Sequence, residues 1–384
     1  MKCLELFSGA GGLAKGLEKS GFQPVQFIEF NKHACNSLRK NFDPKLVFEG
    51  DIRDFSFPQF KDLDLIAGGP PCQPFSLAGK HKAHEDDRDM FPYATLAVTK
   101  YQPKAFLFEN VKGLLRKTFS EYFDYIILTL TFPSVNRNTD ESWQKHNDRL
   151  KNINFANFDD VKYHVSHQLI NAADYGVPQK RERVFIIGTR ADLKLDWTFP
   201  PKTHSKKTLD EDKSTGEYWK RHGLRTPTKI ITPPTCTQGN LFYINRLKPW
   251  VTVRDTLCLV PDPRTKNKLE GHDFREGARQ YPGHTGSYID EPAKTLKAGD
   301  HGVPGGENMI RYEDGSVRYF TTYEAKLIQT FDRDYIITGS WGEALRQLGN
   351  AVPTKLSETI GMRLFDLLIG QTMHKVNHPI TINT

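Results

Sequence analysis

A glycine-rich turn near the start of the chain constrains the fold more than any other feature. The stretch LELFSGAGGLAKGLEKSGF, residues 4–22, passes from an apolar strand pattern through several glycines into a helical pattern. Its Gly9, Gly11 and Ala14 fit the G-x-G-x-x-G/A spacing, in which glycine lets a nucleotide approach the backbone. A tight turn that requires small residues for packing alone is the alternative. Both interpretations predict a strand, a turn and a helix in succession.

Short apolar runs alternate with helical patterns throughout residues 1–190. Helices are predicted after Gly12, over 31–40 and 91–100, and from Leu114 towards Leu130, while the predicted strands are KCLELF, VQFIEF, LVFEG, DLIAGG, KAFLFEN and RVFIIGT. This alternation predicts an α/β fold with a doubly wound, Rossmann-like, largely parallel sheet that binds its ligands at the carboxyl ends of the strands. Residues 133–160 are polar and rich in asparagine, which predicts a surface excursion.

The composition changes after residue 190. Proline, threonine, lysine and aromatic residues dominate to about residue 290, and long helical periodicity disappears. Near the C-terminus, PTKLSETIGMRLFDLLIG has a helical pattern with a proline at its start, and we expect it to pack on the first domain. We therefore expect a catalytic domain made of residues 1–190 and about 335–384. A smaller, irregular, β-rich domain with a hinge is expected over about 191–334.

Composition narrows the class of protein. No run of about 18 apolar residues is present, so no membrane span is expected. The N-terminal MKCLELFSGAGG has no signal-peptide pattern, which predicts a cytoplasmic protein. Five cysteines without CxxC spacing argue against a disulfide framework and a zinc site, so no metal is expected. The net charge of +7 fits a polyanionic partner, and equally a basic enzyme without one.

Two carboxylates follow predicted strands at the edge that carries the glycine turn. Glu29 ends the strand VQFIE, where a carboxylate can accept hydrogen bonds from both ribose hydroxyls. Asp51, in FEGDIRDF, ends the next strand and can accept from an adenine amino group. Three strand ends with glycine, glutamate and aspartate favour a nucleoside ligand, without distinguishing NAD from S-adenosylmethionine (SAM).

One cysteine stands in an unusual setting. Cys72 lies in GGPPCQPFSLAGKHKAH, residues 68–84, directly after the apolar run LDLIA. A structural cysteine normally packs inside a helix or strand, whereas this thiol belongs to a strand-to-loop junction that can present it to a ligand. Lys80 and Lys82 follow closely in sequence, and cations near a thiol favour the reactive thiolate. An inert loop thiol is the alternative.

Further chemistry-bearing residues lie on two later strands. Glu109 ends the apolar strand FLFEN, where a buried carboxylate is costly unless it is paired or used, which suits a proton donor. A helix N-terminal acid is the alternative. In QKRERVF, Arg181 and Arg183 alternate along a strand, so both are expected on one face, suited to a phosphate, a base edge or a carboxylate. Surface ion pairs around Glu182 are the alternative.

Together these stretches resemble the cytosine-5 DNA methyltransferases. LELFSGAGGL is similar to the family's SAM loop, PPCQPFS to its nucleophile motif and ENVKGL to its acidic motif. QKRERVF resembles the arginine motif and QLGNAVP the C-terminal cofactor motif. These motifs occur in the family's order over most of residues 1–190 and about 285–365.

The resemblance implies transfer of a methyl group from SAM to C5 of a cytosine flipped out of double-stranded DNA. Cys72 would attack C6, Glu109 would hold N3 and the exocyclic amine, and Arg183, with Arg181 beside it, would brace O2. By position, residues 191–285 would form the target-recognition domain. The implied cofactor contacts are Phe7, Gly9, Gly11, Glu29, Phe30, Asp51, Ile52, Pro71, Asn350 and Val352. The implied DNA contacts after the cysteine are Ser76, Lys80 and Lys82.

Three other functions compete with this interpretation. The tRNA methyltransferases on the same scaffold usually carry Cys-Phe-Thr, which is absent here, and threonine where this chain has Ser76. An NAD-dependent oxidoreductase would explain the glycine turn and Glu29 but not the Cys72 loop. A non-catalytic DNA-binding relative would have lost the thiol. We therefore expect a monomeric, stand-alone modification enzyme of a restriction-modification pair, with a cognate endonuclease as its partner.

Overall fold

The computed structural model describes residues 1–71, 89–227, 246–298 and 308–376, the last six of these by their backbone alone. The chain divides into two compact units. The sheet unit comprises residues 1–170, 182–200 and 357–384, and the second unit comprises residues 171–181 and 201–356. Residues 335–356, expected in the catalytic domain, lie in the second unit, and the functional division of the chain stays a prediction.

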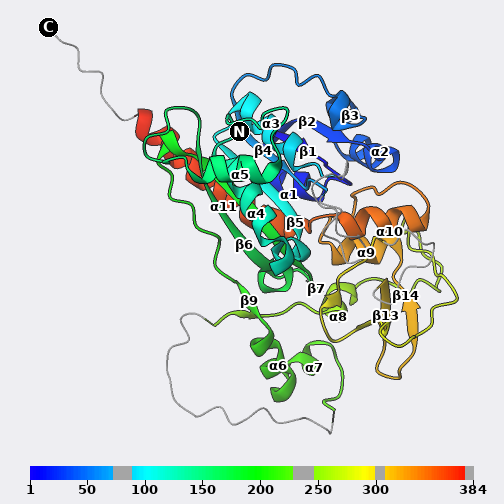
Figure 1. Cartoon of the computed structure of the whole chain (residues 1–384). Coiled ribbons are helices and arrows are strands. Elements are labelled where there is room, and N and C mark those ends of the chain that lie inside the picture. The colour runs from blue at the N-terminus through cyan, green and yellow to red at the C-terminus, as the bar shows by residue number, and fades with distance from the viewer. Residues whose placement is uncertain (72–88, 228–245, 299–307, 377–384) are drawn as a thin grey trace, which may run out of the picture. The chain divides into compact units, whose positions relative to one another are not determined.

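One mixed sheet forms the centre of the sheet unit (Figure 1), in the order β3-β2-β1-β4-β5-β8-β6. Its strands are β1 (Lys2–Leu6), β2 (Gln23–Glu29), β3 (Val47–Glu49), β4 (Leu63–Gly68), β5 (Ala105–Val111), β6 (Tyr163–Asn171) and β8 (Glu182–Arg190). The pairs from β3 to β5 are parallel, whereas β8 runs antiparallel to β5. All six predicted strands and the doubly wound topology are confirmed, and β6 is an addition.

The strand order reverses between β1 and β4. The chain builds β2 and β3 on one side of β1, then crosses to β4 and β5 on the other side. In doubly wound sheets ligands bind outside the carboxyl ends of the strands at such a switch point. The glycine turn follows β1, and the segment that leads to Cys72 follows β4. Two of the predicted functional motifs therefore start at this switch point.

Helices cover both faces of the sheet. They are α1 (Gly12–Lys19), α2 (Lys32–Asn41), α3 (Phe91–Tyr101), α4 (Ser120–Thr131), α5 (Trp143–Lys151) and α11 (Thr354–Val376). Neighbouring residues of a strand point to opposite faces. Ile28 of β2 accordingly packs in a core with α3 and α4, whereas Phe27 packs with Ala14 of α1 and Leu38 of α2. Each fully buried side chain of this size contributes roughly 1.5–3 kcal/mol through its removal from water.

Two segments of the structure differ in detail from the prediction. The helix expected from Leu114 begins only at Ser120. Arg116 has an extended backbone (φ −68°, ψ 144°) that separates a 3-10 turn over Lys112–Leu115 from a second one, Lys117–Phe119, which leads directly into α4. The surface excursion over 133–160 contains α5, capped by the Ser142 hydroxyl, which accepts from Lys145 N at 3.3 Å. The polar composition of this segment conceals a helix with one buried face.

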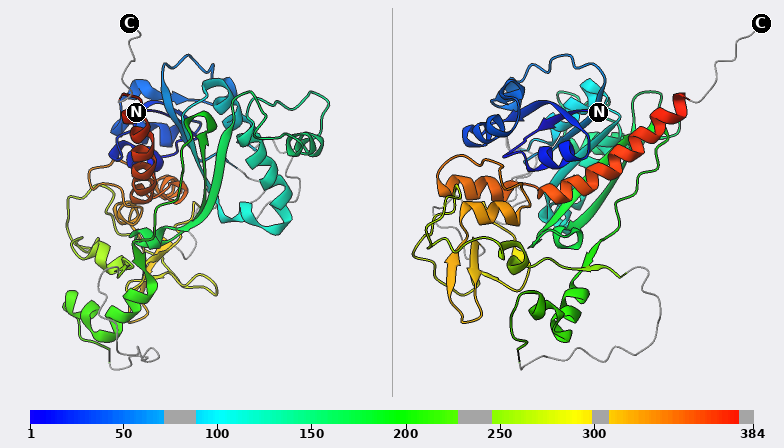
Figure 2. Two further views of the ribbon diagram at one scale, coloured as in Figure 1. Left: turned by 90° about the vertical axis from the view of Figure 1, so that its left-hand side faces the viewer. Right: turned by 180° about the vertical axis from the view of Figure 1, so that it is seen from behind.

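The C-terminal helix packs on the sheet unit as predicted. Within α11, Ser357 Oγ donates to Gly12 O at 3.1 Å, and the Phe365 ring meets Phe22 edge-on, with centroids 5.3 Å apart. Gly21 has φ +99°, and a Cβ there would lie 2.7 Å from the Phe365 ring. Glycine at position 21 thus allows both the turn and the close approach of α11 (Figure 2).

The second unit consists of short elements. Its strands are β7 (Gln179–Lys180), β9 (His204–Ser205), β10 (Lys248–Pro249), β11 (Ser287–Tyr288), β12 (Ala293–Lys294), β13 (Met309–Arg311) and β14 (Val317–Tyr319). They form a sheet β11-β13-β14 and the pairs β10-β9 and β12-β7. The helices are α6 (Lys206–Thr215), α7 (Glu217–Arg221), α8 (Val253–Leu257), α9 (Thr322–Ile328) and α10 (Trp341–Asn350). The irregular strands were predicted, and the short helices between them were not.

Candidate active site

The glycine turn is joined to the end of β2 by a backbone hydrogen bond. Gly9 has φ +55°, and its N–H donates to Glu29 Oε2 at 2.7 Å, while Glu29 Oε1 accepts from Asn31 N at 2.7 Å. Both carboxylate oxygens are thus fixed at the edge of the turn. A Cβ at Gly9 would meet no heavy atom within 4 Å. The turn faces open space beside an oriented carboxylate, an arrangement that fits a ribose.

Two further residues after strand ends contribute to this edge. Phe30, directly after β2, leaves 75% of its surface exposed, so a flat apolar ring is presented to solvent beside Glu29. Asp51 accepts hydrogen bonds from Arg53 Nε at 2.9 Å and Nη2 at 2.6 Å. The hydrogen bond from Arg53 lowers the pKa of Asp51, which keeps this carboxylate ionised as an acceptor. A ring platform and an acceptor are the groups that an adenine requires.

The other predicted cofactor residues of the sheet unit follow the same strand ends. Phe7 has φ +54°, a left-handed conformation that is costly for a non-glycine residue and recurs at functional sites. Ile52 is buried in the main core, next to Asp51. Pro71 accepts a hydrogen bond from Met90 N at 3.1 Å, which ties the end of the β4 segment to the start of α3.

Glu109 and Arg183 meet at the border of β5 and β8. Glu109 is buried, and Arg183 Nε lies 2.9 Å from its Oε1. The antiparallel register pairs Val111 with Arg183, so the arginine reaches diagonally to the carboxylate. This contact lacks hydrogen-bond geometry, and Oε1 has no hydrogen-bond partner among the described residues. A buried carboxylate oxygen therefore keeps an unused hydrogen-bonding capacity beside a guanidinium.

Glu109 also lies next to the segment that leads to the cysteine. A Cβ at Gly69 would be 3.6 Å from Glu109 Oε2, and Asn110 Nδ2 donates to Pro70 O at 3.0 Å. Gly68 ends β4, where a Cβ would lie 2.3 Å from a backbone oxygen of β1, so no larger residue fits. Asn110 is not among the predicted site residues, although its place directly after the acid at a strand end is a usable signal.

Arg181 has different surroundings from those predicted. It is fully buried in the second unit, where its Nη1 donates to Gly349 O at 2.9 Å and its Nη2 to Asn350 O at 3.5 Å. These carbonyls end α10, where a cation is favourable because the helix dipole is negative there. Two nitrogens of this guanidinium thus donate to backbone oxygens, and the predicted role of Arg181 beside Arg183 at the substrate stays a prediction.

Asn350 and Val352 lie at the end of α10 in the second unit. Gly349 packs so closely on the backbone of Ala298 that a Cβ would lie 2.5 Å from Ala298 N. Gln329 Nε2 donates to Ala351 O at 3.3 Å, while the Asn350 side chain remains exposed. The QLGNAVP segment is therefore held by buried contacts that leave Asn350 accessible.

Four predicted residues, Cys72, Ser76, Lys80 and Lys82, lie outside the described residues. Over the described part of the chain, no group of three or more histidine, cysteine, aspartate or glutamate side chains could hold a metal ion. In the same part, no helix has the length and apolar character needed to cross a membrane.

Comparison with known proteins identifies the family. The model of the C-5 cytosine-specific DNA methylase family matches residues 1–132 and 138–366. The chain is 35% identical over 370 residues to the Type II methyltransferase M.NgoMIV of Neisseria gonorrhoeae, covering 95% of this chain and 97% of that protein. It is 32% identical over 370 residues to M.PspPI of Psychrobacter sp. (strain TA137), covering 95% and 79%.

Solved structures show the same fold. The S. pombe Dnmt2 methyltransferase aligns over 98% of this chain and 100% of its own, with a TM-score of 0.55 and 17% identity. The Entamoeba histolytica methyltransferase EhMeth aligns over 96% and 98%, with a TM-score of 0.57 and 16% identity. The sheet, the glycine turn and the acidic strand ends are those of a Rossmann-like fold, which these structures share. The chain belongs to the C-5 cytosine-specific DNA methylase family, and it is a DNA cytosine-5 methyltransferase.

Proposed function

We propose that this enzyme methylates a cytosine flipped out of duplex DNA through a covalent bond between Cys72 Sγ and C6 of the base. The observation that carries the proposal is the buried Glu109, whose Oε1 has no hydrogen-bond partner among the described residues while Arg183 lies 2.9 Å away. The β4 segment beside Glu109 leads directly to Cys72. Because a base cannot be reached inside a duplex, the target has to be extruded into the pocket.

The methyl donor of this proposal is SAM, and the glycine edge fits it. Glu29 would hold the ribose, and Phe30 would stack on the adenine. Asp51 would accept a hydrogen bond from the adenine amino group. SAM supplies the electrophilic methyl group and leaves as S-adenosylhomocysteine. The remaining contacts in the proposal are Phe7, Gly9, Gly11, Ile52, Pro71, Asn350 and Val352.

The protein's own part is to turn C5 of cytosine into a nucleophile. The Cys72 thiolate forms a bond to C6, and the electron pair of the C5–C6 double bond moves towards C5. Glu109 donates a proton at N3 and accepts from the exocyclic amine, while Arg183 stabilises O2, so charge is neutralised as it develops. After C5 gains the methyl group, a base removes the C5 proton, the double bond re-forms and the thiolate leaves.

Arg181 and the residues after Cys72 complete the proposal. We assign Arg181 to holding the end of α10, because its hydrogen bonds go to Gly349 and Asn350. Ser76, Lys80 and Lys82 would contact phosphates on either side of the extruded nucleotide, since phosphate contacts position a protein on DNA.

The names of the relatives support a biological role. M.NgoMIV and M.PspPI are named as Type II methyltransferases and match this chain over most of both lengths. We therefore assign the chain to a restriction-modification system, acting as a monomer on the DNA of a prokaryotic cytoplasm and protecting its site from a cognate endonuclease.

The decisive experiment measures transfer of isotopically labelled methyl groups to mixed-sequence duplex DNA and, separately, to bulk tRNA. Label recovered as 5-methyldeoxycytidine from DNA alone supports the proposal, whereas label in tRNA alone would replace the substrate. Cys72→Ser is expected to abolish transfer. Glu109→Gln should lower kcat about 100-fold, as removal of one preorganised group typically does. The matched control Glu121→Gln, an exposed carboxylate on α4, should leave kcat unchanged.

A further inference from the structure

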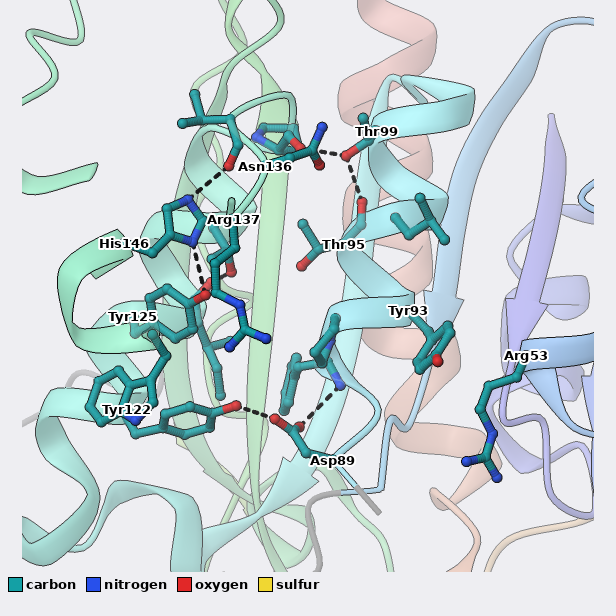
Figure 3. Close-up of a pocket in the computed structure, with 18 residues that line it drawn as sticks. Arg53, Asp89, Tyr93, Thr95, Thr99, Tyr122, Tyr125, Asn136, Arg137 and His146 are labelled. Carbon is teal, nitrogen blue, oxygen red and sulfur yellow. Dashed lines mark hydrogen bonds between the residues drawn. The ribbon is translucent and has the colours of Figure 1, made fainter. Parts of the chain in front are cut away.

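A cavity of about 540 Å³ lies in the sheet unit, bordered by α3, α4, α5 and residues 133–137 (Figure 3). None of the residues assigned above to the cofactor or to the target base lines it. Cavities of this size hold drug-sized ligands. The proposed function assigns no ligand to this cavity.

One wall of the cavity is aromatic and fixed in position. The Trp143 ring lies 5.2 Å from Tyr122 and 5.5 Å from Tyr125, measured between centroids. The Tyr125 hydroxyl and His146 Nδ1 are 2.9 Å apart, and His146 Nε2 lies 2.9 Å from Val135 O. Since the carbonyl only accepts, Nε2 donates to it, and the neutral ring accepts from Tyr125 through Nδ1. Burial lowers the pKa of His146, which favours this neutral form.

The charged residues described at the cavity differ in their partners. Asp89 accepts from the Tyr122 hydroxyl and from Phe91 N, and Arg53 is paired with Asp51 at 2.6 Å. Arg137 is exposed at the rim of the cavity and forms no hydrogen bond or ion pair with the described residues. Its guanidinium extends towards the space between Tyr125 and Asp89 (Figure 3). Its positive charge opposes the effect of burial on Tyr125, which places the two groups within electrostatic reach.

We propose that this cavity binds a small aromatic anion, a planar ring that carries one carboxylate, sulfonate or phosphate group. The ring packs against Tyr122, Tyr125 and Trp143, since aromatic pairs gain energy beyond their buried area. The anionic group pairs with Arg137, whose planar fork matches such groups in two hydrogen bonds. Thr95 of α3 lines the opposite side of the cavity.

The test uses the aromatic sulfonate 8-anilino-1-naphthalenesulfonate as probe and the full-length protein. Fluorescence titration is expected to show saturable binding at one site per chain. Arg137→Gln should weaken the affinity about ten-fold or more, the effect of losing a charge-assisted hydrogen bond. Thr95→Trp should abolish binding by filling the cavity while leaving Arg137 in place. The matched control Arg116→Gln, an exposed arginine outside the cavity, should bind as the wild type does.

Competition separates this cavity from the cofactor site. S-adenosylhomocysteine at saturating concentration should leave the probe bound, and circular dichroism should show that every variant is folded. Displacement of the probe by S-adenosylhomocysteine would assign the binding to the cofactor site and overturn the proposal. Absence of saturable binding, or equal affinities for the wild type and Arg137→Gln, would overturn it as well. None of these outcomes affects the methyl-transfer assay.

Discussion

The buried Glu5, next to the glycine turn, is expected to make the stability of the fold depend on pH. It lies on β1, directly before the turn, with 2% of its surface exposed. Burial raises its pKa from 4.5 to about 8; a hydrogen bond from the Ala14 backbone opposes the rise, and the charge of Glu29 adds to it. The folded chain therefore holds the Glu5 proton more tightly than the unfolded chain does.

The sign and size of the effect follow from proton linkage. The contribution of Glu5 to the free energy of unfolding is fully present below pH 4.5, where the residue is protonated in the folded and the unfolded chain. This contribution is lost as the pH rises towards 8. Between pH 6 and pH 8 the unfolded chain is ionised at this position while the folded chain largely is not. The linkage relation then gives a decrease of about 2 kcal/mol in the free energy of unfolding over this interval.

Glu5→Gln isolates this contribution, because glutamine keeps the shape and the acceptor for Ala14 N but does not titrate. We expect the free energy of unfolding of the variant to rise by about 2 kcal/mol relative to that of the wild type as the pH increases from 6 to 8. Urea denaturation at constant ionic strength, followed by circular dichroism, measures the difference. The control Glu18→Gln changes an exposed carboxylate of the sheet unit and should show no such trend. Parallel pH curves for the wild type and Glu5→Gln would refute the reasoning.

Three further predictions concern packing, charge and ligand binding. Gly68→Ala should lower the free energy of unfolding by about 1–3 kcal/mol, because the new Cβ meets a β1 backbone oxygen at 2.3 Å; Gly342→Ala, on α10 with open space around it, should cost nothing in the same denaturation assay. Glu324→Gln should destabilise the second unit by about 3–5 kcal/mol, measured by calorimetry, because it removes the negative charge that neutralises the buried Arg318 at 2.6 Å. Restored stability when Arg318→Met is added would confirm that cause. Glu29→Ala should weaken SAM binding at least about ten-fold by titration calorimetry through loss of charge-assisted hydrogen bonds, and an unchanged affinity would contradict the ribose assignment.

The central strands of the sheet could be predicted because they are buried on both faces. Such strands appear as continuous apolar runs, as in DLIAGG and KAFLFEN, and each is followed by a turn and a helical pattern. The strand β6, YHVSHQLIN, was missed because it lies at the edge of the sheet and is only partly buried. Its histidines, serine and glutamine interrupt the apolar pattern, so nothing local distinguishes it from a loop. The other edge strand, β3, was predicted because Leu46, Val47 and Phe48 form a short apolar run, which β6 lacks.

The two arginines of QKRERVF differ in whether a local strand pattern can predict their contacts. The alternation rule assumes one continuous strand, but β7 ends at Lys180 and β8 begins at Glu182, so Arg181 lies in the break. Arg183 stays within β8, and its register with β5 brings it to Glu109, as a strand pattern can predict. Arg181 instead binds the carbonyl of Gly349, which lies 168 residues further along the chain. Residue type and spacing are the same for both arginines, so their roles separate only through partners that are remote in sequence. Substitution of Arg181 by lysine should accordingly lower the stability of the second unit, whereas the same change at Arg183 should act on methyl transfer, a contrast that calorimetry and the transfer assay measure directly.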